Sequence, residues 1–209
     1  MKPKSVIQRL LRYFRSRSRE EVRIGIYGAP NVGKTTLANR IAEDWGAERF
    51  GEVSEIPHET RCSVRRRVRI ELGSSRVDFE IVDTPGVATK VDYRKFLKYG
   101  LDVREAKQRA KEATRGVVEA IRMLKNIDGA LVVIDSTKDP LTQVNVTLIG
   151  NLEANEIPFI VVANKIDLKE ADPSAVEDAF SDYPIVKVSA KTGENMEDLY
   201  KAMVREFTS

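Results

Sequence analysis

The stretch Gly28-Ala29-Pro30-Asn31-Val32-Gly33-Lys34-Thr35 matches the spacing G-x-x-x-x-G-K-[ST]. An apolar run over residues 22–27 precedes it and predicts a buried strand, and residues 36–44 after it predict a helix. Glycine lets the backbone turn tightly, so that N–H groups and the positive end of the helix can face an anion. The sequence therefore predicts a phosphate-binding loop between a strand and a helix.

Three side chains close to these phosphates can be assigned from the sequence. Lys34 would reach the β- and γ-phosphates of a nucleotide, and the Thr35 hydroxyl would ligate Mg²⁺. A second short motif, Asp-Thr-Pro-Gly at 83–86, follows a predicted strand at 77–82. An aspartate at a strand end can hold Mg²⁺ through a water molecule, so Asp83 is a further metal candidate. The backbone N–H of Gly86 can approach a γ-phosphate, because glycine has no side chain in the way.

Two later motifs indicate which base is bound. Asn164-Lys165-Ile166-Asp167 ends in a carboxylate that can accept hydrogen bonds from the N1–H and N2–H₂ edge of guanine, which adenine lacks. Lys165 would lie along the base and the phosphate loop. Ser189-Ala190-Lys191 would offer a backbone N–H to the guanine O6. Together these motifs predict selection of guanine, because a wrong base leaves the polar groups unpaired.

Strands and helices alternate along the chain. Strands are expected at residues 22–27, 64–72, 77–82, 130–135, 159–163 and 185–188, and helices at 36–44, 103–125, 141–154, 172–180 and 196–207. Asp139-Pro140 and Asp172-Pro173 are typical helix starts, and Asn195 is expected to cap the last helix. The pattern predicts a three-layer α/β domain around a six-stranded, mostly parallel sheet with one antiparallel strand. That strand belongs to a hairpin over residues 64–82.

Composition places the chain among globular proteins. It has 209 residues, of which 42% are hydrophobic and 32% charged, and no run is long enough to cross a membrane. The only cysteine is Cys62, which excludes an intrachain disulfide and favours a reducing cytoplasm. The only histidine is His58, which excludes a metal site built from two histidines. We expect a basic segment over residues 1–19 and one domain over residues 20–209.

The basic segment leaves several interpretations open. It carries seven basic residues and no acidic one, so a net charge of −4 remains for the rest of a chain whose total is +3. Residues 5–15 form an amphipathic pattern, which can pack on its own domain, lie on an anionic membrane surface, or dock on a partner. The alternating arginines at 65, 67 and 69 form a basic stripe that is either a solvated strand face or a partner surface.

The four motifs in this order resemble the translation-factor class of Ras-like P-loop GTPases, and within it the Era and TrmE branch. The details that favour this branch are G-x-P-N-x-G-K-T in the phosphate loop, Asp-Thr-Pro-Gly, and Glu59-Thr60-Arg61. In the family a threonine of the first switch loop ligates Mg²⁺ when GTP is bound, which implies that role for Thr60. Glu59 replaces the first threonine of the family's T-T-R motif.

The resemblance also implies slow hydrolysis of GTP to GDP and phosphate. Val87 follows Gly86, and an apolar side chain cannot orient water. In related enzymes a potassium ion, held partly by the phosphate-loop asparagine, acts at the phosphates, and that asparagine is Asn31 here. The expected catalytic residues are therefore Asn31, Lys34, Thr60 and Gly86, and the expected metal ligands are Thr35, Thr60 and Asp83. The expected nucleotide-binding residues are Gly28, Ala29, Pro30, Asn31, Val32, Gly33, Lys34, Thr35, Thr36, Asp83, Gly86, Asn164, Lys165, Asp167, Ser189, Ala190 and Lys191.

By the same resemblance, the chain is expected to be a GTP-operated switch in ribosome maturation or RNA modification. Era proteins carry an RNA-binding KH domain after the GTPase domain, and we expect this chain to lack it. Two alternatives remain open: a membrane-associated switch that uses residues 1–19, and a nucleotide-binding regulator with negligible turnover. The expected partners are a guanine nucleotide, an unknown protein effector, RNA or the ribosome, and an anionic membrane surface.

Overall fold

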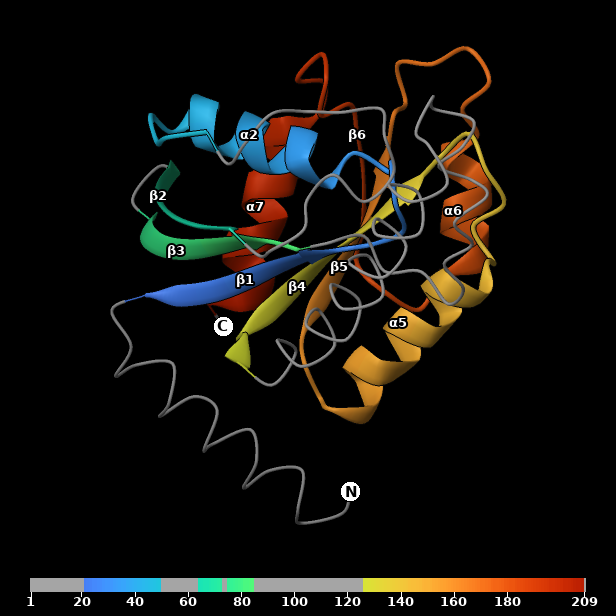
Figure 1. Ribbon diagram of the computed structural model, residues 1–209, viewed down its shortest axis with the longest axis horizontal. Helices are drawn as coiled ribbons and strands as arrows, with labels where there is room; N and C mark the ends of the chain where they lie inside the picture. The colour runs from blue at the N-terminus through green and yellow to red at the C-terminus, as the bar shows by residue number, and fades with distance from the viewer. Residues whose placement is uncertain (1–20, 50–63, 73–74, 85–125, 209) are drawn as a thin grey trace, which may run out of the picture.

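The computed structural model describes residues 21–49, 64–72, 75–84 and 126–208 (Figure 1). The predicted basic segment at 1–19 and the predicted helix at 103–125 lie outside the described residues. Within the described parts of the chain, no helix has the length and apolar character needed to span a membrane.

The sheet has six strands in the order β2-β3-β1-β4-β5-β6. Every neighbouring pair is parallel except β2 and β3, which form the predicted antiparallel hairpin. The fold class predicted from the sequence is therefore confirmed. The strands are β1 Val22–Tyr27, β2 Val64–Leu72, β3 Ser75–Asp83, β4 Gly129–Asp135, β5 Phe159–Asn164 and β6 Ile185–Val188.

Helices cover both faces of the sheet, which gives three layers (Figure 1). One core cluster joins the sheet to α2 and α7, and the other joins it to α5 and α6. The helices are α2 Lys34–Asp44, α5 Gln143–Ala154, α6 Pro173–Ala179 and α7 Met196–Phe207. Sequence periodicity places each of these within two residues of its observed start.

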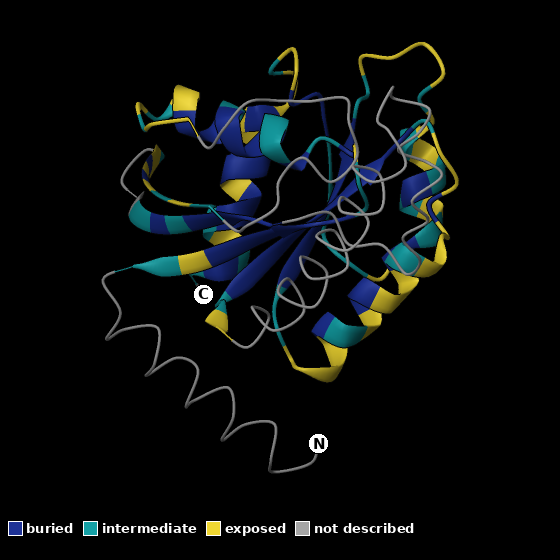
Figure 2. Cartoon of the chain, viewed as in Figure 1, coloured by how far each residue is buried: buried dark blue, intermediate teal, exposed yellow. Residues whose placement is uncertain are grey.

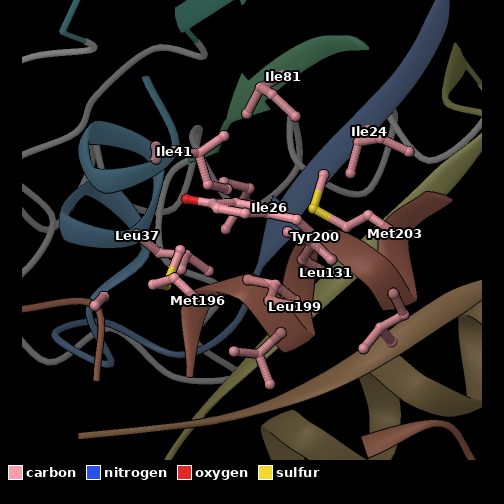
Figure 3. Packing of buried hydrophobic residues seen from close by; sticks show 14 of the residues in the cluster. Ile24, Ile26, Leu37, Ile41, Ile81, Leu131, Met196, Leu199, Tyr200 and Met203 are labelled. Atoms are coloured by element: carbon pink, nitrogen blue, oxygen red, sulfur yellow. The ribbon is translucent and has the colours of Figure 1, made fainter. Parts of the chain in front are cut away.

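The central strands are buried on both faces, as their continuous apolar sequences predict. Every residue of β4 and β5 is buried, and Figure 2 shows the sheet as the dark interior of the domain. Alternate residues serve the two layers: Leu131 packs toward α2 and α7, whereas Val132 packs toward α5. Figure 3 shows the first cluster, with Leu37 and Ile41 of α2 facing Met196 and Tyr200 of α7. Burying one such side chain contributes about 1.5–3 kcal/mol.

The predicted start of α5 and the predicted side-chain cap of α7 need correction. Helix α5 begins at Gln143 rather than at residue 141, because the Asp139 carboxylate accepts from the Leu141 N–H in a turn. The Thr142 hydroxyl then accepts from the Asn145 N–H and caps the helix. Asn195 does stand at the start of α7, but its side chain makes no cap hydrogen bond and donates instead to the Lys187 carbonyl of β6.

The basic stripe on β2 is largely balanced by acidic neighbours. Arg67 pairs with Glu21 at 2.8 Å, and Arg69 pairs with Asp78. On β1 of the same sheet, Arg23 pairs with Glu80 at 2.7 Å. This arrangement favours the solvated strand face over the partner surface.

The parallel strands bring the predicted motifs to one edge of the sheet. Gly28 follows β1, Asp83 ends β3, Asn164 ends β5 and Ser189 follows β6. Because all four strands run in the same direction, these positions meet at their carboxyl ends, where open α/β sheets bind ligands.

Candidate nucleotide-binding site

The phosphate loop spans the six residues between β1 and α2, and its backbone depends on glycine at both ends. Gly28 has φ +149°, and a Cβ there would lie 2.3 Å from the Val133 carbonyl oxygen. Gly33 has φ +98°, and a Cβ there would lie 2.4 Å from Asn164 Nδ2. Asn31 between them has φ 62°, in the left-handed region. The loop can therefore lie against β4 and β5 only with glycine at 28 and 33.

Helix α2 presents its amino end to this loop. Its first hydrogen bond runs from the Leu37 N–H to the Gly33 carbonyl at 2.8 Å. The earlier N–H groups, at Lys34, Thr35 and Thr36, therefore have no partner within the helix. N–H groups of this kind and the helix dipole make a favourable position for phosphate oxygens.

The Lys34 side chain lies inside the loop. Only 6% of it is exposed, and Nζ donates to the Ala29 carbonyl at 2.8 Å. Burial lowers the pKa of the ammonium to about 8, and the charge of Asp83 opposes that shift. A buried ammonium group that, among the described residues, donates to a neutral carbonyl is a suitable group to receive a phosphate anion.

Thr35 and Asp83 form the candidate magnesium site. The Thr35 hydroxyl donates to Asp83 Oδ2 at 2.8 Å, and Asp83 is almost fully buried. Burial raises the pKa of Asp83, whereas the Thr35 hydrogen bond and the Lys34 charge act in the opposite direction. Asp83 Oδ1 is buried and has no hydrogen-bond partner within the part of the chain that the structure describes. A hydroxyl and a carboxylate with a free oxygen fit Mg²⁺, which prefers oxygen ligands and retains several waters.

Asn164 connects the phosphate end of the site to the base end. Its Nδ2 donates to the Val32 carbonyl at 2.9 Å, and its Oδ1 accepts from the Ala190 N–H at 3.0 Å. Only 2% of the residue is exposed. The side chain therefore uses both ends of its amide to hold the phosphate loop and the 189–191 loop together.

Lys165 is held by two partners. Its Nζ donates to the Asn31 carbonyl and to Asp135 Oδ2, both at 2.7 Å. Burial alone would raise the pKa of Asp135, but hydrogen bonds from Lys165 and Thr137 outweigh it and keep that pKa below its ordinary value. The expected position of Lys165 along the phosphate loop agrees with this geometry.

Asp167 is exposed and is oriented by Ser189. The buried Ser189 hydroxyl donates to Asp167 Oδ1 at 2.7 Å and accepts from the Thr192 N–H. The Ser189 N–H donates to Glu194 and the Ala190 N–H to Asn164, so both are already used. The Lys191 N–H has no hydrogen-bond partner among the described residues, which makes it the available donor of the three.

The structure thus assembles most of the predicted set at one edge, including Pro30 in the phosphate loop. Thr60 and Gly86 lie outside the described residues, as do Arg61 and Val87. Sequence reasoning missed two supporting residues, Asp135 and Arg40. Asp135 ends a fully buried strand, which is a usable signal for a functional carboxylate, whereas Arg40 lies within α2 and belongs to no motif.

Comparison with known proteins gives a consistent result. Residues 23–165 match a family described as 50S ribosome-binding GTPases. The tRNA modification GTPase MnmE of Heliobacterium modesticaldum is 32% identical over 189 residues, covering 90% of this chain and 34% of that protein. GTPase Der of Symbiobacterium thermophilum is 33% identical over 181 residues, covering 82% of this chain and 33% of that protein. This chain therefore spans about a third of the length of these two relatives.

The fold comparison agrees with the sequence comparison. A solved structure of an Aquifex aeolicus Era variant bound to GDP and AlF₄⁻ has a TM-score of 0.68 and 25% identity, covering 90% of this chain and 57% of that one. The fold and these similarities define a P-loop GTPase domain. The chain belongs to the 50S ribosome-binding GTPase family and is of the Era, Der and MnmE type. The motifs predicted an Era-like P-loop GTPase, which this result confirms. Family membership implies GTP, GDP and Mg²⁺ as ligands.

Proposed function

We propose that this chain is a GTP-operated switch that binds GTP with Mg²⁺ and hydrolyses it slowly to GDP and phosphate. The observation that carries the proposal is the Asn164 side chain, which ties the loop of the buried Lys34 to the loop of Ser189. A nucleotide has its phosphates and its base at opposite ends, and this site has matching groups at the same two ends.

Guanine recognition would fall to the base end of the site. The Asp167 carboxylate, held by Ser189, would accept from the N1–H and N2–H₂ groups of guanine. The Lys191 N–H would donate to O6, and the methylene chain of Lys165 would lie along the ring. A polar site of this kind discriminates by roughly 10⁴–10⁵ against a base that leaves its groups unpaired.

Phosphate binding would fall to the loop and the first turn of α2. The Lys34 ammonium would exchange its bond to the Ala29 carbonyl for the β- and γ-phosphates. Thr35 and Asp83 would hold Mg²⁺, which when bound offsets the negative charge of those phosphates. A switch would follow if Thr60 and Gly86 contact the γ-phosphate, because hydrolysis would release both loops.

Slow turnover is expected because Val87 cannot orient a water molecule. The potassium role of Asn31 is supported by its place at the apex of the loop, where Lys165 holds its carbonyl. Phosphate release from GTP should be measurable over hours with Mg²⁺, and faster in K⁺ than in Na⁺. Equal rates in the two salts would remove the potassium role. Release no faster than from buffer alone would leave the nucleotide-binding regulator as the better description.

A role in ribosome maturation or RNA modification is supported by the family description and by the MnmE relative. The competing membrane role is supported by the seven basic residues of segment 1–19. Co-sedimentation of the GTP-bound protein with ribosomes and with anionic lipid vesicles separates the two. Binding to vesicles that disappears when residues 1–19 are deleted would favour the membrane role, and nucleotide-dependent binding to ribosomes would favour the first.

A further inference from the structure

An arginine of α2 donates hydrogen bonds to the 189–191 loop. Arg40 Nη2 donates to the Lys191 carbonyl at 2.9 Å, and Arg40 Nε donates to the Ala190 carbonyl at 3.3 Å. Both carbonyls belong to the loop that the guanine O6 would meet. The guanidinium carbon also lies 3.6 Å from the place where a Cβ of Gly193 would be, so it rests against the same loop.

Arg40 is itself held in place by neighbours on α2 and α7. Its Nη1 lies 3.6 Å from Asp44 Oδ1, and the other oxygen of Asp44 accepts from the Tyr200 hydroxyl at 2.6 Å. The Tyr200 ring is buried and packs edge-to-face on Trp45 at a centroid distance of 5.4 Å (Figure 3 shows the ring extending from α7 toward α2). The guanidinium therefore has a fixed position as well as two loop partners.

The hydrogen bond from Arg40 to the Ala190 carbonyl also determines the direction of the Lys191 N–H, because both groups belong to one peptide unit. In a trans peptide the C=O and N–H groups point in opposite directions, and the described residues contain no cis peptide bond. Because Arg40 holds the Ala190 carbonyl toward α2, the N–H of the same peptide unit, at Lys191, points away from α2. The Ala190 N–H donates to Asn164, so Lys191 carries the donor left for O6.

We propose that Arg40 is a positioning residue for guanine recognition, acting through the Lys191 N–H on the O6 atom of the base. This inference rests on the proposed function, because it needs guanine in the site. Arg40 lies outside the recognition motifs. It would act on the O6 atom of guanine, whereas Asp167 would contact the N1–H and N2–H₂ groups.

The test compares three nucleotides on two proteins. 6-Thio-GDP replaces O6 with sulfur, a weak acceptor, and IDP lacks the N2 amino group that Asp167 would contact. Arg40→Met keeps the apolar stem of the side chain and removes its donors. We expect the dissociation constant for GDP to rise about tenfold in this variant. The penalty for 6-thio-GDP relative to GDP should shrink by about threefold or more, while the penalty for IDP should not change.

Matched variants separate positioning from folding. Arg49→Met removes an exposed arginine that pairs with Glu43, and should bind all three nucleotides as the wild type does. Tyr200→Phe removes only the hydroxyl that holds Asp44, and should shift the 6-thio-GDP penalty in the same direction by a smaller factor. This variant decides the matter if Arg40→Met fails to fold.

Three results have distinct meanings. A reduced penalty for 6-thio-GDP alone supports the assignment of Arg40 to O6. Equal losses for GDP, 6-thio-GDP and IDP would overturn it, because the residue would then serve only the fold. Wild-type protein that binds none of the three would overturn the proposed function first and this inference with it.

Discussion

The two ends of the nucleotide site are built in different ways. The phosphate end is one continuous stretch of backbone from Gly28 to Thr35, shaped by residues with positive φ. The base end is assembled from segments more than twenty residues apart, joined by side chains such as Asn164 and Ser189 that bond to other loops.

This difference indicates how each end should fail. The phosphate end depends on the absence of side chains, so adding a single methyl group should damage it. The base end depends on particular polar atoms, so removing one carboxylate or guanidinium should change affinity or specificity while the fold remains. The following predictions test that contrast, from the largest expected effect to the smallest.

Asp167→Asn should change which base is bound. An amide can donate to the O2 atom of xanthine but cannot accept from the guanine edge as a carboxylate does, so preference should move from GDP toward XDP by roughly 10³-fold. Competition against a fluorescent guanine nucleotide measures the shift. Asp178→Asn, an exposed acid on α6, is the control and should change nothing. A proportionate loss of both nucleotides would contradict the assignment.

Gly28→Ala should destabilise the domain and abolish nucleotide binding. The added Cβ would lie 2.3 Å from a backbone oxygen of β4, and φ +149° is strained for alanine. Relief requires backbone movement, so we expect a loss of about 3 kcal/mol in the free energy of unfolding. Gly150→Ala in α5 is the matched control, because nothing lies within 4 Å of its added Cβ. That control should be about 0.5–1 kcal/mol more stable than wild type by urea unfolding.

Asp135→Asn should weaken nucleotide binding without changing base preference. Lys165 would keep its bond to the Asn31 carbonyl but lose its charged partner at 2.7 Å. Loss of one charge-assisted hydrogen bond should raise the dissociation constant for GDP about tenfold. The ratio of XDP to GDP affinity should stay at the wild-type value, in contrast to Asp167→Asn. A change in that ratio would mean that Asp135 acts on the base directly.

Phosphate binding should weaken as pH rises above about 8, the pKa to which burial brings Lys34. Only the ammonium form attracts phosphate, and phosphate raises its pKa, so binding in this range should take up protons. Affinity for GDP should fall by up to about tenfold per pH unit. Lys34→Arg keeps its charge in this range, so its affinity should not follow the Lys34 titration. An identical pH slope in both proteins would show that another group is titrating.

In the protein without nucleotide, the Lys34 titration should change the free energy of unfolding in the opposite direction. The pKa of Lys34 is lower in the folded state than in the unfolded one, so between about pH 8 and the ordinary lysine value the unfolded chain binds more protons. The contribution of Lys34 to the free energy of unfolding should therefore increase with pH over that interval.

The phosphate end and the positions of the strands along the chain could be predicted from the sequence because the information is local. Glycine spacing, apolar runs and the Asp172-Pro173 helix start each decide their own structure, and the observed elements agree with them. The base end was predicted only as far as its motifs extend. Arg40 could not be found this way, because an arginine on a helix gains a role only when the fold brings the 189–191 loop to it.

Local signals also misplaced two details. Asp139-Pro140 suggested an earlier start for α5, but the turn that this aspartate forms delays the helix to Gln143. Asn195 was expected to cap α7, but with φ 58° its side chain reaches the Lys187 carbonyl of β6 instead. In both cases a polar side chain bonds to one of two nearby backbone groups. Composition and spacing do not determine which of the two it bonds to.

Titration calorimetry of the wild-type chain with GDP and with ADP, in the presence of Mg²⁺, tests the central claim most directly. We expect one GDP bound per chain and ADP binding weaker by a factor of about a thousand or more. Uptake of neither nucleotide, or equal uptake of both, would contradict it.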